Sequence, residues 1–183
     1  MSNNLFLEQF NKSIENNEFI EMYSYSGNGN EFAVGQIIAY SSEELLIHAI
    51  NNMGMDDGFF IGKIKDICKI STNTKYLQDV TNLIKSNETF IFPISGEIKD
   101  MNLFDYFIKF CVTHETIVTI HTYFQESLHG AIIDYLSDML KIKIYTDGGY
   151  ENGESIIRVN DIETISFNGI EEKRIEKLMK ICL

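Results

Sequence analysis

Two stretches of this chain, Gly35-Gln-Ile-Ile-Ala-Tyr40 and Gly130-Ala-Ile-Ile-Asp-Tyr135, share their length and their pattern of glycine, isoleucine and tyrosine. They lie 95 residues apart, and the same offset aligns 17 identical residues in the 51 positions from 35 to 85. Average composition predicts about 3 identities over that length. The matches are mainly glycines and apolar residues, which set turns and a core. Self-similarity at a fixed offset indicates an internal repeat.

The repeat extends upstream with an offset of 98, which aligns Leu5-Phe6 with Leu103-Phe104. The difference of three residues falls in 26–31, a Gly- and Asn-rich stretch of the kind that hairpin loops tolerate. We therefore predict a first domain over 1–87, a linker over 88–102 and a second domain over 103–183. The two domains are expected to superimpose, with the largest difference at 26–31.

One copy of the repeat has the pattern of a helix, five short strands and a second helix. In the second copy, apolar residues recur with helical spacing over 103–111. Asn168 and Glu171 fit a capping box at the start of a closing helix. Strands are predicted between these helices from β-branched runs and strict alternation, over 117–123, 130–135, 140–144, 155–159 and 162–166. Five short strands with tight loops favour a small closed or nearly closed barrel.

The order of elements, with a glycine opening the second strand, resembles the Sm-like fold of the Sm and Hfq RNA-binding proteins. The run Gly130-x-Ile132…Tyr135…Asp138…Leu140-x-Ile142 is similar to the first motif of that family. Ile157-Arg158-Val-Asn160-Asp161 is similar to its second motif, although Val159 stands where the family has glycine. The resemblance implies a mainly β fold with flanking helices, arranged as two tandem five-stranded Sm-like barrels. A general SH3-like barrel would show much the same pattern.

An RNA-binding barrel of this type would present one ligand face in the second copy. Lys141 and Lys143 are predicted to point outward from one strand, and Arg158 lies on a neighbouring strand. The candidate ligand face therefore contains Tyr135, Asp138, Lys141, Lys143, Arg158 and Asn160. The alternative is an ordinary solvated strand face.

Composition argues against nucleic acid and membrane partners. The chain of 183 residues carries 27 acidic and 15 basic residues, for a net charge of −12. The acidity is spread over both copies, and it repels phosphate backbones and anionic lipid at long range. There is no apolar run of 18 residues, no signal-peptide pattern and no CxxC pair among the three cysteines. We expect a cytoplasmic protein with free thiols.

No motif in the sequence predicts catalysis. His121 and His129 flank one hairpin and could form half of a metal site, but no third ligand has a recognisable spacing, so structural histidines are favoured. Asp56, Asp57, Glu151 and Glu154 flank glycine-rich turns, where solvated carboxylates are favoured over a calcium site. The aromatic residues of 103–111 fit either a stacking platform or a core. No cofactor or metal is expected.

The sequence therefore predicts a non-enzymatic cytoplasmic interaction or regulatory protein that binds another protein or itself. The alternative is an Sm-like RNA-binding protein, which the net charge disfavours. The expected assembly is a monomer with docked barrels, or a dimer.

Overall fold

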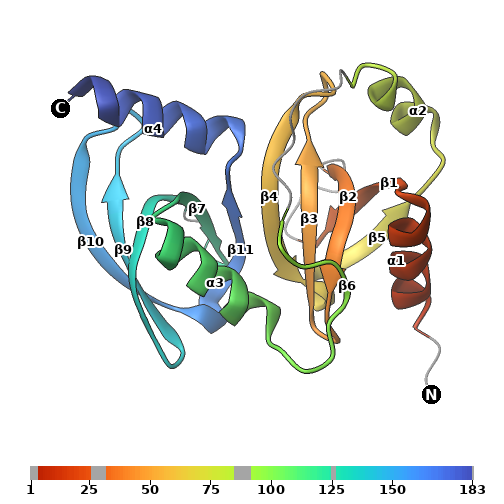
Figure 1. Ribbon diagram of the computed structural model, residues 1–183, viewed down its shortest axis with the longest axis horizontal. Coiled ribbons are helices and arrows are strands. Elements are labelled where there is room, and N and C mark those ends of the chain that lie inside the picture. The colour runs from red at the N-terminus through yellow and green to blue at the C-terminus, as the bar shows by residue number, and fades with distance from the viewer. Residues whose placement is uncertain (1–3, 26–31, 85–91, 125–126, 183) are drawn as a thin grey trace. The chain divides into compact units, whose positions relative to one another are not determined.

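The structure is a computed structural model that describes residues 4–25, 32–84, 92–124 and 127–182. The same series of elements occurs twice, in warm colours and then in cool colours in Figure 1. The first copy contains α1 (Leu5–Asn16), β1 (Phe19–Ser24), β2 (Ala33–Tyr40), β3 (Glu44–Ile50), β4 (Asp56–Lys63), the 3₁₀ turn η1 (Ile64–Asp66), β5 (Ile67–Ser71) and α2 (Lys75–Thr81). The prediction of a mainly β chain with flanking helices is confirmed.

The second copy repeats this order after a short strand, β6 (Gly96–Glu97), which lies in the stretch predicted as a linker. Its elements are α3 (Leu103–His114), β7 (Ile117–Thr122), β8 (Ser127–Leu136), β9 (Met139–Tyr145), β10 (Glu151–Arg158), η2 (Val159–Asp161), β11 (Ile162–Phe167) and α4 (Ile170–Cys182). β10 begins four residues before the predicted strand, because pairing with β9 continues through a register shift between Glu151 and Glu154. The predicted loop difference at 26–31 lies outside the described residues.

Strand register is the same in the two copies. Gly35 of β2 faces Ile20 of β1, and Gly130 of β8 faces Val118 of β7. β2 and β8 also carry a bulge at the same position, between residues 37 and 39 and between residues 132 and 134. Equal offsets in sequence thus correspond to equal positions in the pleated sheet.

The strands are hydrogen bonded in one open order, β10-β9-β8-β7-β11-β4-β3-β2-β1-β5, with β6 beside β2. Residues 59–62 of β4 pair antiparallel with β11, so that Ile61 faces Ile165 and Phe59 faces Phe167. The prediction of two closed or nearly closed barrels is not confirmed by this open order of strands. The edge of β11 is satisfied by a strand from the other copy, which a pattern within one copy could not show.

The chain divides into two compact units, 1–57 with 63–103 and 58–62 with 104–183. The core of the first unit contains the buried side chains of Phe10, Ile20 and Tyr40. In the second unit Phe107, on α3, packs edge-on against Phe167, with ring centroids 5.4 Å apart. Phe104 and Phe107 are buried, so these two aromatic residues of α3 belong to a core and form no stacking platform.

The start of α4 differs from the predicted capping box by one residue. Asn168 has a left-handed backbone with φ of 60°, and the helix begins at Ile170. The N–H of Gly169 donates to the Glu172 carboxylate at 2.9 Å, which also accepts from the Ser166 hydroxyl. Glu172 is buried while Glu171 pairs with Arg174, and this difference in burial sets the register of the cap.

Within the described residues, no helix is long and apolar enough to cross a membrane.

Candidate functional site

The predicted ligand face divides into two parts in the structure. Asp138, in the β8–β9 turn, lies 3.5 Å from the guanidinium of Arg158 at the end of β10. The carbonyl of Asp138 also accepts the N–H of Val159 at 2.8 Å, which holds the turn against η2, where Asn160 lies. The residues that the two sequence motifs contribute, Asp138, Arg158 and Asn160, are therefore brought to one end of the second unit.

Tyr135 is the penultimate residue of β8 and lies next to this group. Burial, followed by a hydrogen bond with the Asp105 carboxylate, raises the pKa of the Tyr135 phenol to about 12. Asp105 belongs to the first turn of α3 and is also bonded to Lys109. The phenol thus joins β8 to α3 and stays protonated at neutral pH.

Lys141 and Lys143 form the second part, along β9. Lys141 pairs with Glu154, and Lys143 pairs with Glu151 at 3.2 Å, both on the neighbouring strand β10. The hydrogen bond to Glu151 raises the pKa of Lys143. The three cations of the predicted face, Lys141, Lys143 and Arg158, each pair with a carboxylate. Such pairing leaves little net positive charge for a phosphate backbone.

The cross-strand pair has a counterpart in the first copy. His48 Nε2 on β3 lies 2.8 Å from the Asp56 carboxylate on β4, at the positions that correspond to Lys143 and Glu151. The glycine-turn carboxylates Asp56, Glu151 and Glu154 therefore face basic side chains across two strands. The prediction that they are simply solvated was incomplete, because it ignored strand partners.

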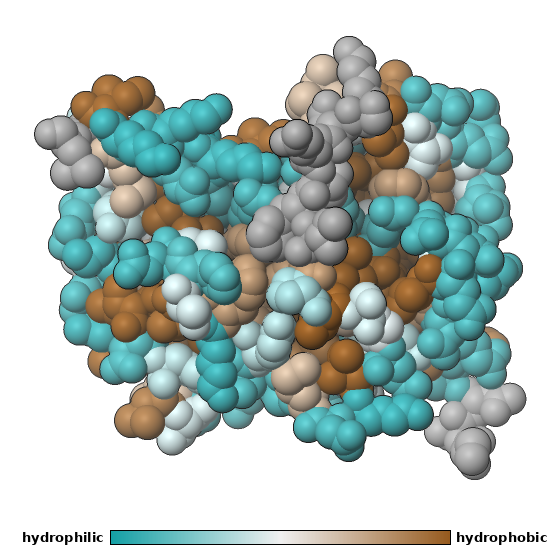
Figure 2. Space-filling view, in the orientation of Figure 1, coloured by the Kyte–Doolittle hydropathy of each residue, from teal (hydrophilic) through white to brown (hydrophobic). Residues whose placement is uncertain are grey.

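Four apolar side chains are exposed where the second copy's β8, β9 and β10 lie side by side. Their exposed fractions are 41% for Ile133, 71% for Leu136, 40% for Met139 and 69% for Ile156. Leu136 faces Met139 across the hairpin, and Ile156 faces Lys141. We call these four residues the apolar face. Figure 2 shows hydrophobic atoms at the surface near the end of this hairpin, at the lower left.

The apolar face was not predicted from the sequence, although the repeat contains a signal for it. At an offset of 95, Leu136 corresponds to Ser41 and Met139 corresponds to Glu44. Both first-copy residues are buried polar residues, and the Glu44 carboxylate accepts from Ser41 Oγ at 2.6 Å. Apolar residues thus replace a polar pair at equivalent positions, and there they are exposed.

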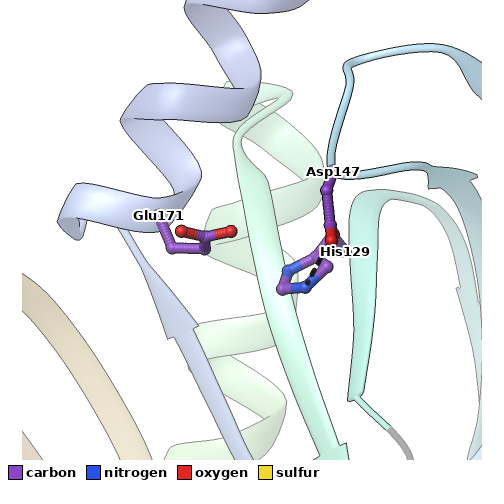
Figure 3. A group of neighbouring side chains, drawn as sticks. All are labelled: His129, Asp147 and Glu171. Carbon is purple, nitrogen blue, oxygen red and sulfur yellow. Dashed lines mark ion pairs between the residues drawn. The ribbon is translucent and has the colours of Figure 1, made fainter.

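A second cluster joins three elements of the second unit, as Figure 3 shows. His129 of β8, Asp147 of the β9–β10 turn and Glu171 of α4 each offer a metal-ligating atom, and these atoms lie within 4.8 Å of one another. Nδ1 of His129 lies 3.0 Å from the Thr119 hydroxyl, while Nε2 lies 3.8 Å from Asp147. An imidazole and two carboxylates are a ligand set suited to a divalent transition metal.

Arg174 binds two of the three residues of this cluster. Arg174 donates to both carboxylate oxygens of Glu171, and its NH1 donates to the Asp147 carbonyl at 3.0 Å. The Arg174 hydrogen bond lowers the pKa of Glu171. The negative charge that would attract a cation is therefore already partly balanced. The arrangement fastens the first turn of α4 to the β9–β10 turn.

His121 and His129 lie on the same face of the β7–β8 hairpin, two residue pairs apart. Each imidazole is bonded to a hydroxyl, with His121 Nδ1 2.8 Å from the Ser127 hydroxyl and His129 Nδ1 3.0 Å from the Thr119 hydroxyl. Partial burial lowers the pKa of His121, against the opposing effect of the Glu163 carboxylate. Sequence spacing alone could not find Asp147 and Glu171, which approach His129 only through the turn and the helix.

Two of the cysteines have described side chains, and both are free thiols. Cys68 is exposed, and Cys111 is buried within α3. Burial raises the pKa of Cys111 to about 12, so its thiolate is scarce at neutral pH.

No protein-family model matches this chain, and no curated protein matches it at a significant level.

Proposed function

We propose that this chain is a non-enzymatic interaction protein of the cytoplasm, and that it binds another protein through the apolar face of its second copy. The apolar face carries the proposal, because a cluster of large exposed apolar side chains rimmed by charges is typical of a protein-binding surface. Leu136 and Ile156, the two most exposed residues of the face, are rimmed by Lys141 and Arg158.

The matching of charges supports a protein partner over RNA. Lys141, Lys143 and Arg158 each lie against a carboxylate, and the chain has a net charge of −12. An RNA ligand would have to displace three carboxylates in an acidic environment. A protein partner that buries apolar side chains needs no such displacement.

We also propose that each copy is an Sm-like small barrel unit. Three features support this interpretation: the helix that precedes five strands, the order in which the fifth strand pairs with the first, and the 3₁₀ turn between the fourth and fifth strands. The contact between Asp138 and Arg158 joins the two positions at which the sequence resembles the family's motifs.

Co-purification with matched charge variants tests the protein-binding proposal. The double variant Leu136→Lys and Ile156→Lys places two charges on the apolar face, while Met53→Lys changes an exposed first-copy residue as a control. We expect the wild-type and Met53→Lys proteins to recover the same partner after ribonuclease treatment, and the double variant to lose at least about tenfold of it, since a charge opposes burial in an apolar interface. Equal recovery by all three proteins would contradict the proposal.

RNA binding remains the second candidate, since Asp138, Arg158 and Asn160 gather where an Sm-like barrel would bind a base. Gel shifts with short U-rich and A-rich RNA at low salt test it. We expect no shift at micromolar protein. A shift that weakens steeply with salt and disappears in Arg158→Glu would replace the protein-binding proposal with an RNA-binding one.

A further inference from the structure

The first copy shows how the bent second strand of the repeat receives an additional strand. β1 pairs with β2 only as far as Gln36, before the bulge. Beyond the bulge, the same edge of β2 is occupied by β6, which lies parallel to it with Ala39 beside Gly96 and Tyr40 beside Glu97. The N–H of Ile98 donates to the Tyr40 carbonyl at 2.7 Å. The edge is thus completed by an extended segment from outside the five-stranded unit.

The seated segment has a simple pattern. Phe92 is buried and Ile94, Gly96 and Ile98 are half-buried, whereas Pro93, Ser95 and Glu97 are exposed. Gly96 has φ of 86°, a backbone conformation that favours glycine. The pattern is an apolar residue at every second position, with glycine at the point where the segment crosses the bent strand.

Beyond its paired residues, the segment contacts the β2–β3 turn through hydrogen bonds. The Glu44 carboxylate accepts from Asn102 Nδ2 at 2.8 Å and from the N–H of Leu103 at 3.1 Å. A pocket of about 250 Å³ remains between the turn and the segment, with Ser41 and Glu97 among its lining residues. In the first copy, the polar residues of the β2–β3 turn therefore bind a segment of the same chain.

The second copy has the same bent strand without the additional strand. β7 pairs with β8 only as far as Ala131, and beyond the bulge β8 pairs with β9 on its other side. Among the residues that the structure describes, no strand lies against the β8 edge at 134–136. The N–H of Tyr135 is bound by the side chain of Asp134 at 2.8 Å, at a position where the first copy has Ala39. A side chain thus takes over a backbone donor at the edge corresponding to the one that β6 covers.

The residues of the β8–β9 turn beside this edge also differ from those of the β2–β3 turn. Leu136 and Met139 stand where the first copy has Ser41 and Glu44, and they are exposed. Glu44 binds the start of a helix, which methionine cannot do. Leu136 and Met139 instead offer apolar surface to a segment that lies along β8.

We infer that the β8 edge at 134–136 is a binding site for an extended segment of a protein partner, which adds as a strand parallel to β8. The segment carries apolar residues at alternate positions and a glycine at the crossing point, as Phe92-x-Ile94-x-Gly96-x-Ile98 does in the first copy. Backbone hydrogen bonds to Tyr135 supply affinity, and burial of Leu136 and Met139 supplies selectivity. This inference rests on the proposed function and names the kind of partner that the apolar face receives.

A fusion tests the edge without any knowledge of the partner. A copy of residues 89–102 is placed after Leu183, which puts it at the repeat offset of 95 from its original position. The tether gives the segment an effective concentration of about millimolar, enough to populate a weak contact. The matched control replaces the isoleucine of the added copy that corresponds to Ile98 with proline, which removes the N–H that must donate to the Tyr135 carbonyl.

Amide hydrogen exchange at Tyr135 is the measurement, because Tyr135 corresponds to Tyr40, whose backbone carbonyl faces the added segment in the first copy. We expect exchange to be about tenfold slower or more in the fusion than in its proline control. Asp134→Ala, which restores the first-copy residue, is expected to accelerate exchange at Tyr135 in the unfused chain and to leave it slow in the fusion. Equal exchange in the fusion and the proline control would overturn the inference.

Partner recovery separates this inference from the proposed function. The fusion, whose own segment fills the edge, is expected to lose the partner that the wild-type chain recovers, and the proline control is expected to keep it. If a protected fusion still recovers the partner, binding occurs elsewhere, and the edge inference fails while the interaction function stands. If no form of the chain recovers a protein, the proposed function fails, whatever the exchange data show.

Discussion

At the scale of single residues, Gly35 and Gly130 each lie where the neighbouring strand leaves no space for a side chain. A Cβ atom at Gly35 would come within 3.0 Å of the His48 carbonyl oxygen, and one at Gly130 would come as close to the carbonyl of Lys143. Neither glycine needs a left-handed backbone, so the constraint is space. The sequence alignment of the copies located both positions, because a requirement for space permits no other residue type.

Gly130→Val is therefore expected to destabilise the protein by about 1–3 kcal/mol, since β8 and β9 must move apart to admit the side chain. The measurement is urea unfolding. Gly62→Ala is the control, because its Cβ would meet the Thr164 methyl at 3.3 Å and the Glu163 carbonyl oxygen at 3.8 Å, and its backbone is not left-handed. An unchanged midpoint for Gly130→Val would contradict the steric argument.

Other residue roles depend on neighbours that no local pattern reveals. Lys141 and Lys143 were predicted to point outward, on either a ligand face or an ordinary solvated strand face, and their pairing with Glu154 and Glu151 follows from the β9–β10 register. Asp147 and Glu171 lie 24 residues apart and reach His129 from a turn and from a helix. Sequence spacing predicts contacts along one element, and these contacts join different elements.

At the scale of elements, each copy buries one carboxylate beside the start of its closing helix. In the first copy it is Glu21 of β1, which accepts from the Thr74 hydroxyl and from Tyr23 at 2.9 Å. In the second copy it is Glu172 of α4, which accepts from the N–H of Gly169. Thr119 stands where Glu21 does, so the acid has changed element while its role at the cap is kept.

The exchange of acids makes Thr74 important to the first copy. Its hydroxyl accepts the N–H of Leu77 at 3.1 Å as the N-cap of α2, and it also donates to Glu21. We expect Thr74→Ala to cost about 1–2 kcal/mol, because it removes a helix cap and one donor to a buried carboxylate. Thr74→Ser keeps the hydroxyl and should stay within about 0.5 kcal/mol of wild type. Urea unfolding measures both, and equal losses would assign the effect to the lost methyl group.

The helices and strands of the repeat could be predicted from sequence because period and β-branching are local signals. β6 could not, since Gly96-Glu97 contains no strand-forming residue and pairs through the edge that β2 offers. The α4 cap was predicted one residue early for the same reason. Asn168 and Glu171 fit the spacing, but burial of Glu172 decides the cap, and burial depends on the packing of the sheet.

At the scale of the whole molecule, duplication has left two copies with one backbone plan and different surfaces. The first copy closes its bent strand with β6, and the second exposes Leu136 and Met139 at the equivalent place. Strand pairing between β4 and β11 uses residues 59–62 of the first copy, which belong to the second unit. A periodic pattern predicts what the copies share, and the differences between them carry the candidate function.

The same pairing leads to a prediction about assembly. The Sm-like interpretation that we propose implies assembly through strand edges, and in this chain one pairing between strands of the two copies, β4 with β11, is made internally. The ends of the strand order are then β10 and β5. A net charge of −12 per chain adds repulsion with every chain that joins an assembly. We therefore expect one or two chains in solution at moderate salt, with the mass unchanged by dilution if the chain is a monomer.

Light scattering coupled to size exclusion gives the mass, and higher salt provides the control, because screening would increase the mass if charge alone kept larger assemblies apart. A mass of five or more chains would contradict this expectation, and it would strengthen the RNA-binding alternative.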